Sequence, residues 1–212
     1  MTIIDDTPDT RKVVARFTMN ATQLRDALHV HVAAGKDDAL PTLTGVHVSW
    51  DDLGPVVFAA TDRYRLAVAT TEVKGEGDGV FLLPRRDAIE LIKVLPKPRR
   101  GVPDPDVTVT VTREHVTVFM VHDGSTLSKE YRTLDGEYPK YQTLVPRDTA
   151  TVPTETTAWN PDFMADVAKL PITRNRPVRW KFYGENRPAL ATFQSDNDID
   201  WEYLLMPVRH AG

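Results

Sequence analysis

The sequence predicts an α+β protein of three β-α-β-β-β repeats, with the helices on one face of antiparallel sheets. A segment with apolar residues at helical spacing occurs three times, each time after a short extended run. Three segments of alternating apolar and polar residues follow each helix. Since a lone repeat buries little apolar surface, the repeats are expected to pair. We therefore expect a complete domain at residues 13–146, a half domain at residues 150–212 and a disordered tail at residues 1–12.

The three helices are expected to begin near residues 20, 84 and 160. Asn20 and Asn160 suit an N-cap, while Pro84 and Pro161 suit the start of a helix. Each helix should present one apolar face to a sheet. The residues expected in the core are Leu24, Ala27 and Leu28 with His31 or Val32 from the first helix, Ala88, Ile89, Leu91, Ile92 and Leu95 from the second, and Phe163, Met164, Val167, Ala168 and Leu170 from the third.

The alternating segments are typical of antiparallel strands with one face toward solvent. They span residues 43–50, 56–62 and 65–73 after the first helix, 107–112, 116–123 and 126–134 after the second, and 177–184, 189–195 and 202–209 after the third. The chain nearly ends on "YLLMPVR" (203–209), which we interpret as the last strand of the third repeat. Alternate side chains of that strand would serve the core and a site.

The composition is that of a soluble globular protein, with 41% hydrophobic and 26% charged residues in a chain of 212. The absence of cysteine excludes disulfides, a thiolate nucleophile and Cys-ligated zinc. No segment approaches the roughly 18 apolar residues of a membrane span. The acidic N-terminus "MTIIDDTPDTRK" is unlike a signal peptide. We therefore expect a cytoplasmic protein with no membrane partner.

Basic residues are concentrated in two segments, although the net charge is −4. Residues 84–100 hold six basic and two acidic side chains, and residues 169–187 hold six basic side chains against Glu185. Segregation of this kind can place a local basic surface on an acidic protein.

No catalytic motif is visible, so the sequence predicts neither an enzyme nor a cofactor or metal site. The segment "KGEGDG" (74–79) lacks the Gly-Lys-Ser/Thr ending of a phosphate-binding loop and is expected to be a loop between repeats. The six histidines do not have ligand-like spacing with carboxylates.

Five segments, in this order, resemble the bacterial sliding clamp family, the β subunit of DNA polymerase III. They are "LPTLTGVHVSW" (40–50), "ATDRYRLAVAT" (60–70), "LLPRRDAIELIKVL" (82–95), "LDGEYPKYQTLVP" (134–146) and "YLLMPVR" (203–209). The resemblance covers residues 13–209 and implies the DNA-clamp fold. The resemblance is to an abridged member of this family, one that has the middle domain and only the second half of the last domain. Such abridgement suggests a phage or mobile-element origin.

The resemblance implies a groove that binds the short peptides displayed by DNA polymerases and clamp loaders. The residues carried over to it are Leu43, Thr61, Tyr64, Arg65, Leu66 and Pro146 on one wall, and Asn160, Phe163, Leu204, Leu205, Met206, Pro207, Val208 and Arg209 on the other. Arg63 stands where the family usually has glycine, and Tyr64 stands where histidine is common. Ligand preference is therefore expected to differ.

The resemblance also implies non-specific contacts between helices and the phosphates of duplex DNA. The candidates are Arg25, Arg85, Arg86, Lys93, Lys97, Arg99, Arg100, Lys169, Arg174 and Arg176. A protein with both properties would act at the nucleoid as a polymerase processivity factor.

Several functional alternatives remain open at this point. Twelve repeats close the rings of the family, so four copies of this chain would supply the number needed for a homo-oligomeric ring. The main alternative is a monomeric clamp mimic or decoy that binds clamp partners without encircling DNA. A further alternative is an accessory factor in transcription or recombination.

Overall fold

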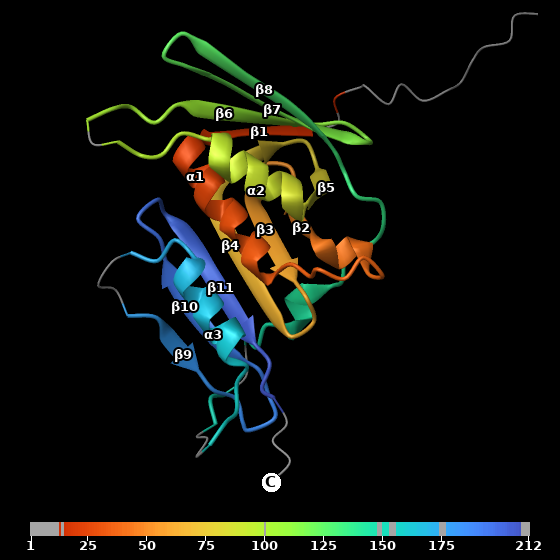
Figure 1. The fold of residues 1–212 in the computed structure, drawn as a ribbon, viewed down its shortest axis with the longest axis vertical. Helices are drawn as coiled ribbons and strands as arrows, with labels where there is room; N and C mark the ends of the chain where they lie inside the picture. The colour runs from red at the N-terminus through yellow and green to blue at the C-terminus, as the bar shows by residue number, and fades with distance from the viewer. Residues whose placement is uncertain are drawn as a thin grey trace, which may run out of the picture.

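The computed structural model describes residues 13, 15–99, 101–147, 150–152, 156–173 and 177–208. Antiparallel strands dominate it, and short helices lie against them (Figure 1). The elements are β1 (Ala15–Asn20), α1 (Ala21–Ala27), η1 (Leu28–Ala33), η2 (Pro41–Thr44), β2 (Gly45–Trp50), β3 (Pro55–Thr61), β4 (Arg65–Glu76), β5 (Gly79–Pro84), α2 (Arg85–Val94), β6 (Asp106–Val111), β7 (His115–His122), β8 (Ser125–Arg132), η3 (Tyr141–Leu144), α3 (Pro161–Asp166), η4 (Val167–Lys169), β9 (Arg179–Lys181), β10 (Ala189–Gln194) and β11 (Ile199–Leu205).

The first two repeats pair by exchanging their opening strands. β1 pairs with β6 of the second repeat, from Ala15 opposite Val111 to Asn20 opposite Asp106. In return, β5 pairs with β2 of the first repeat along the whole of both strands. The two resulting sheets, β1-β6-β7-β8 and β5-β2-β3-β4, also meet where β1 touches the end of β4. Each of these two repeats therefore completes the sheet of the other.

The third repeat joins the first through main-chain pairing. β11 lies antiparallel to β4, from Ile199 opposite Thr71 to Leu205 opposite Arg65. Because β3 pairs with the other side of β4, the strands β5-β2-β3-β4-β11-β10-β9 form one continuous sheet. Figure 1 shows α1 and α3 in front of this sheet, with α3 over β10 and β11.

Apolar side chains fill both faces of the long sheet around β11. The cluster on the helical side includes Phe17, Phe58 and Trp201, which are fully buried. Because side chains alternate along a strand, Tyr203 enters that cluster while Leu204 enters a second cluster on the opposite face. Members of the second cluster include Leu43, Leu66, Val68, Tyr138, Tyr141 and Tyr183. The C-terminal part of β11, from Tyr203 to Leu205, is therefore buried on both faces of the sheet.

The helix starts agree with the sequence, but part of the expected burial does not. Asn160 caps α3, since its Oδ1 accepts the N–H of Asp162 at 2.9 Å, and Pro84 directly precedes α2. The prediction that Met164 and Ala168 are buried is wrong, because Met164 is 42% exposed and Ala168 is also exposed. In the described part of the chain no second helix covers that face of α3.

Two expectations about the third repeat also need correction. Residues 156–160 lead into α3 without forming a strand, and the described residues before them make only one bridge, between Val152 and Tyr183. The last strand ends at Leu205, so residues 206–208 lie beyond it, and Arg209 falls outside the described residues. The third repeat therefore lacks, among its described residues, the opening strand seen in the other two.

The segment "KGEGDG" is mostly strand, which corrects the expectation of a loop. β4 continues to Glu76 and β5 begins at Gly79, so the turn between them is very short. A Cβ on Gly75 or Gly79 would lie 1.8 or 2.0 Å from the ring of Trp50. These glycines are therefore needed for Trp50 to pack against the strands. Among the described helices, none is long and apolar enough to cross a membrane.

Candidate functional site

The turn between β3 and β4 has a tight network of hydrogen bonds. Asp62 Oδ1 accepts the N–H groups of Tyr64 and Arg65, both at 3.0 Å. The hydroxyl of Thr61 donates to the carbonyl of Arg65 at 2.6 Å and accepts the N–H of Arg63 at 3.1 Å. These bonds hold Arg63 in the left-handed region, at a φ of 79°. As a result, Arg63 and Tyr64 are exposed at the tip of a rigid turn.

Arg65 connects this turn to α3 and is only 6% exposed. Its Nε donates to Asp62 Oδ2 at 3.0 Å, and its guanidinium also donates to Asp166 of α3. The guanidinium carbon lies 4.3 Å from the centre of the Phe163 ring, within the range of a cation–π contact. A buried arginine held by two carboxylates fixes α3 relative to the first repeat.

The ionisation of Asp166 supports this connection. Burial by itself would raise the pKa of Asp166, but hydrogen bonds from Lys169 and Arg65 outweigh it and the net shift is downward. Asp166 is therefore a stable anion at neutral pH. Removing one member of such a buried ion pair typically costs roughly 3–5 kcal/mol, because an unpaired charge stays behind.

The segment after β11 is held against the same turn. The N–H of Met206 donates to the carbonyl of Tyr64 at 2.8 Å, and the N–H of Val208 donates to the carbonyl of Ala158 at 2.9 Å. The Tyr64 ring stacks on Phe163, with centroids 6.3 Å apart and ring planes at 27°. First and third repeats thus meet at an aromatic pair with main-chain bonds beside it.

A cavity of about 510 Å³ opens beside this aromatic pair. Four of the residues that the resemblance assigns to a groove line it, namely Leu43, Tyr64, Arg65 and Phe163. The remaining lining residues are Ala34, Gly35, Lys36, Asp37, Leu40, Asp62 and Arg63. The segment from Ala34 to Leu40 was missed because it is a polar connection with no periodic pattern. The cavity combines an apolar wall with the cationic side chains of Lys36 and Arg63 and the carboxylate of Asp37.

Other groove candidates do not line this cavity. Thr61, Leu66, Leu204 and Leu205 are at most 5% exposed, because β3, β4 and β11 are covered on both faces at this end of the strands. These four side chains therefore belong to the core beneath the site, and none has enough exposed surface to contact a ligand. Asn160 is engaged as the cap of α3.

Four of the groove candidates, Met206, Pro207, Val208 and Pro146, lie outside the cavity lining. Met206 is 38% exposed and Val208 is 50% exposed, and Pro207 is partly exposed between them. Pro146 lines a different cavity of about 510 Å³, together with Arg147, Tyr183 and Arg187.

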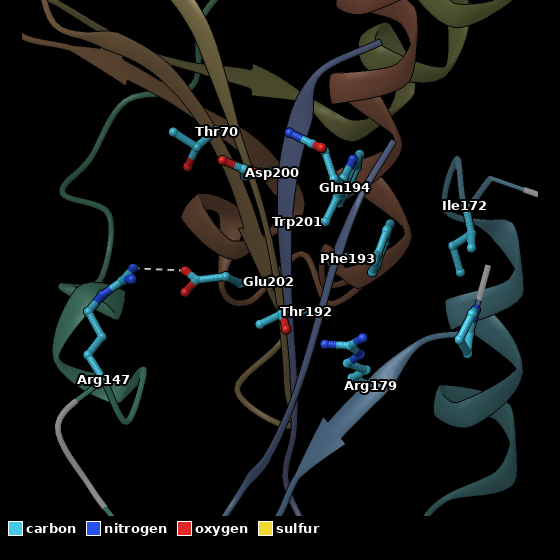
Figure 2. Close-up of a pocket in the computed structure, with 11 residues that line it drawn as sticks. Thr70, Arg147, Ile172, Arg179, Thr192, Phe193, Gln194, Asp200, Trp201 and Glu202 are labelled. Carbon is cyan, nitrogen blue, oxygen red and sulfur yellow. Dashed lines mark hydrogen bonds and ion pairs between the residues drawn. The ribbon is translucent and has the colours of Figure 1, made fainter. Parts of the chain in front are cut away.

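A third hollow, of about 600 Å³, lies over β4, β10 and β11 and was not predicted from the sequence (Figure 2). Figure 2 shows Thr70, Asp200 and Glu202 along these strands, with Phe193 and Ile172 on the other side. Glu202 forms an ion pair with Arg147 at 2.8 Å. No group of three or more His, Cys, Asp or Glu residues that could hold a metal occurs in the described part of the chain.

The basic side chains proposed to contact DNA differ in how exposed they are and in whether they already have a partner. The Arg25 side chain is 18% exposed and lies 3.5 Å from Asp26, and Arg85 Nε donates to the carbonyl of His31 at 3.3 Å. Lys169 is paired with Asp166. By contrast, Arg86 has an 87% exposed side chain, although Asp87 is nearby. The other exposed cations in or after α2 are Lys93, Lys97 and Arg99, while Arg100, Arg174 and Arg176 lie outside the described residues.

Comparison with known proteins places the chain among replication clamps. The family model for the central domain of the DNA polymerase III beta subunit matches residues 18–140. The beta sliding clamp of Streptomyces coelicolor is 32% identical over 157 residues, which cover 72% of this chain and 40% of that protein. The beta sliding clamp homolog GriR of Streptomyces muensis is 33% identical over 128 residues, covering 58% of this chain and 32% of GriR.

Solved structures share the fold. A DNA polymerase sliding clamp from Pseudomonas aeruginosa superimposes with a TM-score of 0.76 at 18% identity, covering 94% of this chain and 68% of that one. The β subunit from Thermotoga maritima gives a TM-score of 0.73 at 18% identity, covering 98% of this chain and 69% of that one. A Pseudomonas aeruginosa clamp bound to griselimycin gives 0.73 at 17% identity, covering 92% and 65%.

These matches first define the class, because the α+β architecture predicted from the sequence is the fold of a DNA sliding clamp. The match to the central-domain model over residues 18–140 then decides the family. The chain belongs to the DNA polymerase III β subunit family. It spans 40% and 32% of the length of the two Streptomyces relatives.

Proposed function

We propose that this chain is a sliding-clamp-like processivity factor that binds short peptide motifs of a DNA polymerase and its clamp loader. The observation that carries the proposal is the cavity beside the Asp62–Arg65 turn. Leu43, Tyr64 and Arg65 from the first repeat and Phe163 from the third line it together. Apolar walls with a few fixed polar groups are typical of sites for small ligands and peptides. Family membership supports the same assignment.

The proposal assigns binding, and no catalysis, to the chain. Tyr64 and Phe163 provide an aromatic wall, and Leu40 and Leu43 provide aliphatic surface. Met206 and Val208 offer further exposed apolar surface beside Tyr64. A peptide with large apolar side chains could bury them here, while Lys36 and Arg63 could pair with its acidic groups. The place of action would be the cytoplasm, at the nucleoid.

Duplex DNA is the second proposed partner. The exposed cations of α2 and the segment after it, Arg86, Lys93, Lys97 and Arg99, would contact phosphates without reading bases. Encircling DNA would need more than the three repeats found here, which several copies could supply. A clamp mimic that occupies polymerase peptides without encircling DNA is the second candidate, and it is favoured by the candidate DNA contacts Arg25, Arg85 and Lys169, whose side chains have partners within the chain.

The peptide site can be tested with griselimycin, because a clamp with this fold has been solved bound to it. Calorimetric titration should detect binding to the chain, and Phe163→Ala should weaken it about ten-fold or more through loss of the aromatic wall. The control is Phe119→Ala, since Phe119 is 45% exposed on β7, away from the cavity. Thermal unfolding of both variants would verify that they fold. Equal affinities for the two variants, or no binding by the wild type, would contradict the proposed site.

A further inference from the structure

Two of the cationic side chains that line the cavity beside the Asp62–Arg65 turn have no partner. Lys36 and Arg63 are exposed, and neither forms an ion pair among the described residues. Arg65 differs from them, because it is buried and its guanidinium is held by Asp62 and Asp166. A ligand in this cavity would therefore meet two positive charges that no carboxylate of the chain has yet neutralised.

The two carboxylates of the cavity lining offset these charges only in part. Asp62 Oδ1 accepts the N–H groups of Tyr64 and Arg65, and its Oδ2 accepts the Nε–H of Arg65. Asp37 is exposed, and its Oδ1 accepts the N–H of Ala39 at 2.9 Å. Because Asp62 is already paired with Arg65, Asp37 alone opposes the two unpaired cations. The charge that the lining offers to a ligand is therefore net positive.

The backbone fixes where the side chain of Arg63 begins. Arg63 has a φ of 79°, and its N–H donates to the hydroxyl of Thr61 at 3.1 Å. Side chains other than glycine are unfavourable at such a φ, and strained residues of this kind cluster at functional sites. The next residue, Tyr64, stacks on Phe163. Arg63 therefore places a guanidinium directly beside the aromatic wall of the cavity.

We propose that this site selects peptides that carry an aspartate or glutamate close to a large apolar residue, and that Arg63 selects them. The inference rests on the peptide site proposed above. A guanidinium can hold a carboxylate through two parallel hydrogen bonds, whereas the ammonium of Lys36 acts as a point charge. Arg63 and Tyr64 are consecutive, with Cα atoms about 3.8 Å apart. The acidic and apolar residues of the peptide should therefore lie within about two positions of each other.

A phosphate of DNA is the other anion that two cations would attract. The cavity favours a peptide for two reasons. Asp37 belongs to the lining and would repel the closely spaced phosphates of a DNA strand. Leu40, Leu43 and Phe163 provide apolar surface that suits the side chains of a peptide. We therefore assign the two cations to a peptide carboxylate, and DNA serves as a competitor in the test.

Calorimetric titration with two matched peptides tests this inference on the full chain. One peptide is acetyl-Gly-Leu-Phe-Asp-Leu-Gly-amide, and the other has asparagine in place of aspartate. Both ends are blocked, so the aspartate is the only charged group. We expect the wild type to bind the aspartate peptide about five-fold more tightly at low salt, as for a charge-assisted hydrogen bond at an exposed site. The preference should decrease as the salt concentration rises.

Three variants identify the side chain that is responsible. Arg63→Gln should reduce the preference to about two-fold or less, and should leave the affinity for the asparagine peptide unchanged. Arg132→Gln is the matched control, because Arg132 is exposed at the end of β8 and does not line the cavity. Asp37→Asn should strengthen binding of the aspartate peptide about two-fold, since asparagine still accepts the Ala39 N–H and no longer repels the ligand. Thermal unfolding verifies that all three variants fold.

Several results would overturn the inference. They are equal affinity of the wild type for the two peptides, an Arg63→Gln variant that keeps the wild-type preference, and one that weakens both peptides equally. If an equal concentration of a short DNA strand blocks the aspartate peptide, the cations bind phosphate, which also overturns it. Griselimycin separates this test from the proposed function. A wild type that binds griselimycin without distinguishing the peptides loses only the acidic preference, whereas one that binds none of the three ligands contradicts both proposals.

Discussion

Arg63 shows how a single backbone conformation defines the edge of the candidate site. Its φ of 79° is uncommon for a residue with a side chain, and the bonds from Thr61 and Asp62 around it keep it there. Among the described contacts its exposed guanidinium has no ion pair. The sequence comparison with clamps indicated glycine as usual at this position, and the structure supplies the reason. Glycine adopts such a φ without steric cost.

Arg63→Gly is expected to raise the free energy of unfolding by about 0.5–1 kcal/mol. Relief of the left-handed conformation gains roughly 1–2 kcal/mol, and the greater freedom of glycine in the unfolded chain returns part of it. Urea denaturation measures the difference. Arg63→Ala is the matched control, because it removes the same side chain and keeps the unfavourable φ. If the glycine variant is no more stable than the alanine variant, Arg63 is not strained.

Other features of the site could not be predicted at the residue level. The contact between Arg65 and Asp166 joins residues 101 positions apart, and neither periodicity nor local motifs carry such information. The resemblance brought Arg65 and Phe163 to the same site, but it did not reveal that the guanidinium stacks on the ring. Asp166 was not predicted at all, because an acidic residue on a surface helix gives no signal of burial.

At the scale of elements, the alternation of apolar residues predicted the strands well and their ends poorly. β11 was expected to continue to Arg209, but the backbone of Met206 bonds to the turn at Tyr64 and that of Val208 bonds to Ala158. A strand ends where its backbone N–H and C=O groups no longer bond to a neighbouring strand. The alternation of apolar residues does not reveal where that happens. Likewise, the apolar residues of α3 indicated a buried face correctly for Val167 and Leu170 but not for Met164.

The packing of the connection from residue 133 to residue 146 predicts that the stability of the fold depends on pH. This connection crosses the outer face of β2, where Tyr138 stacks on His47 with centroids 4.8 Å apart. Burial lowers the pKa of His47 to about 4. The unfolded chain, where a histidine has a pKa near 6.5, therefore binds a proton that the folded chain excludes between these values.

The free energy of unfolding should consequently fall as the pH decreases from about 6.5 to about 4. His47→Phe keeps an aromatic ring against Tyr138 and removes the titration, so its unfolding free energy should depend less steeply on pH, by up to about one proton. Burial also lowers the pKa of His31 to about 4, so a residual slope should persist. Urea denaturation at several pH values checks this. A variant with the wild-type slope would show that His47 does not resist protonation in the folded chain.

At the scale of the whole molecule, the continuous sheet determines how the third repeat is attached to the first domain. Pairing of β4 with β11 holds the third repeat against the first domain. The sequence predicted the odd number of repeats, but the exposed face of α3 emerged only from the structure.

The most direct measurement of the central claim asks whether the protein is topologically linked to DNA. Rings thread onto a linear duplex through its free ends, and blocking both ends with biotin and streptavidin should then trap them. We predict that protein on blocked duplex stays bound when the salt is raised, whereas protein on open duplex is lost. Contacts to phosphates alone weaken with salt regardless of the ends. Equal loss from blocked and open DNA would contradict a sliding clamp.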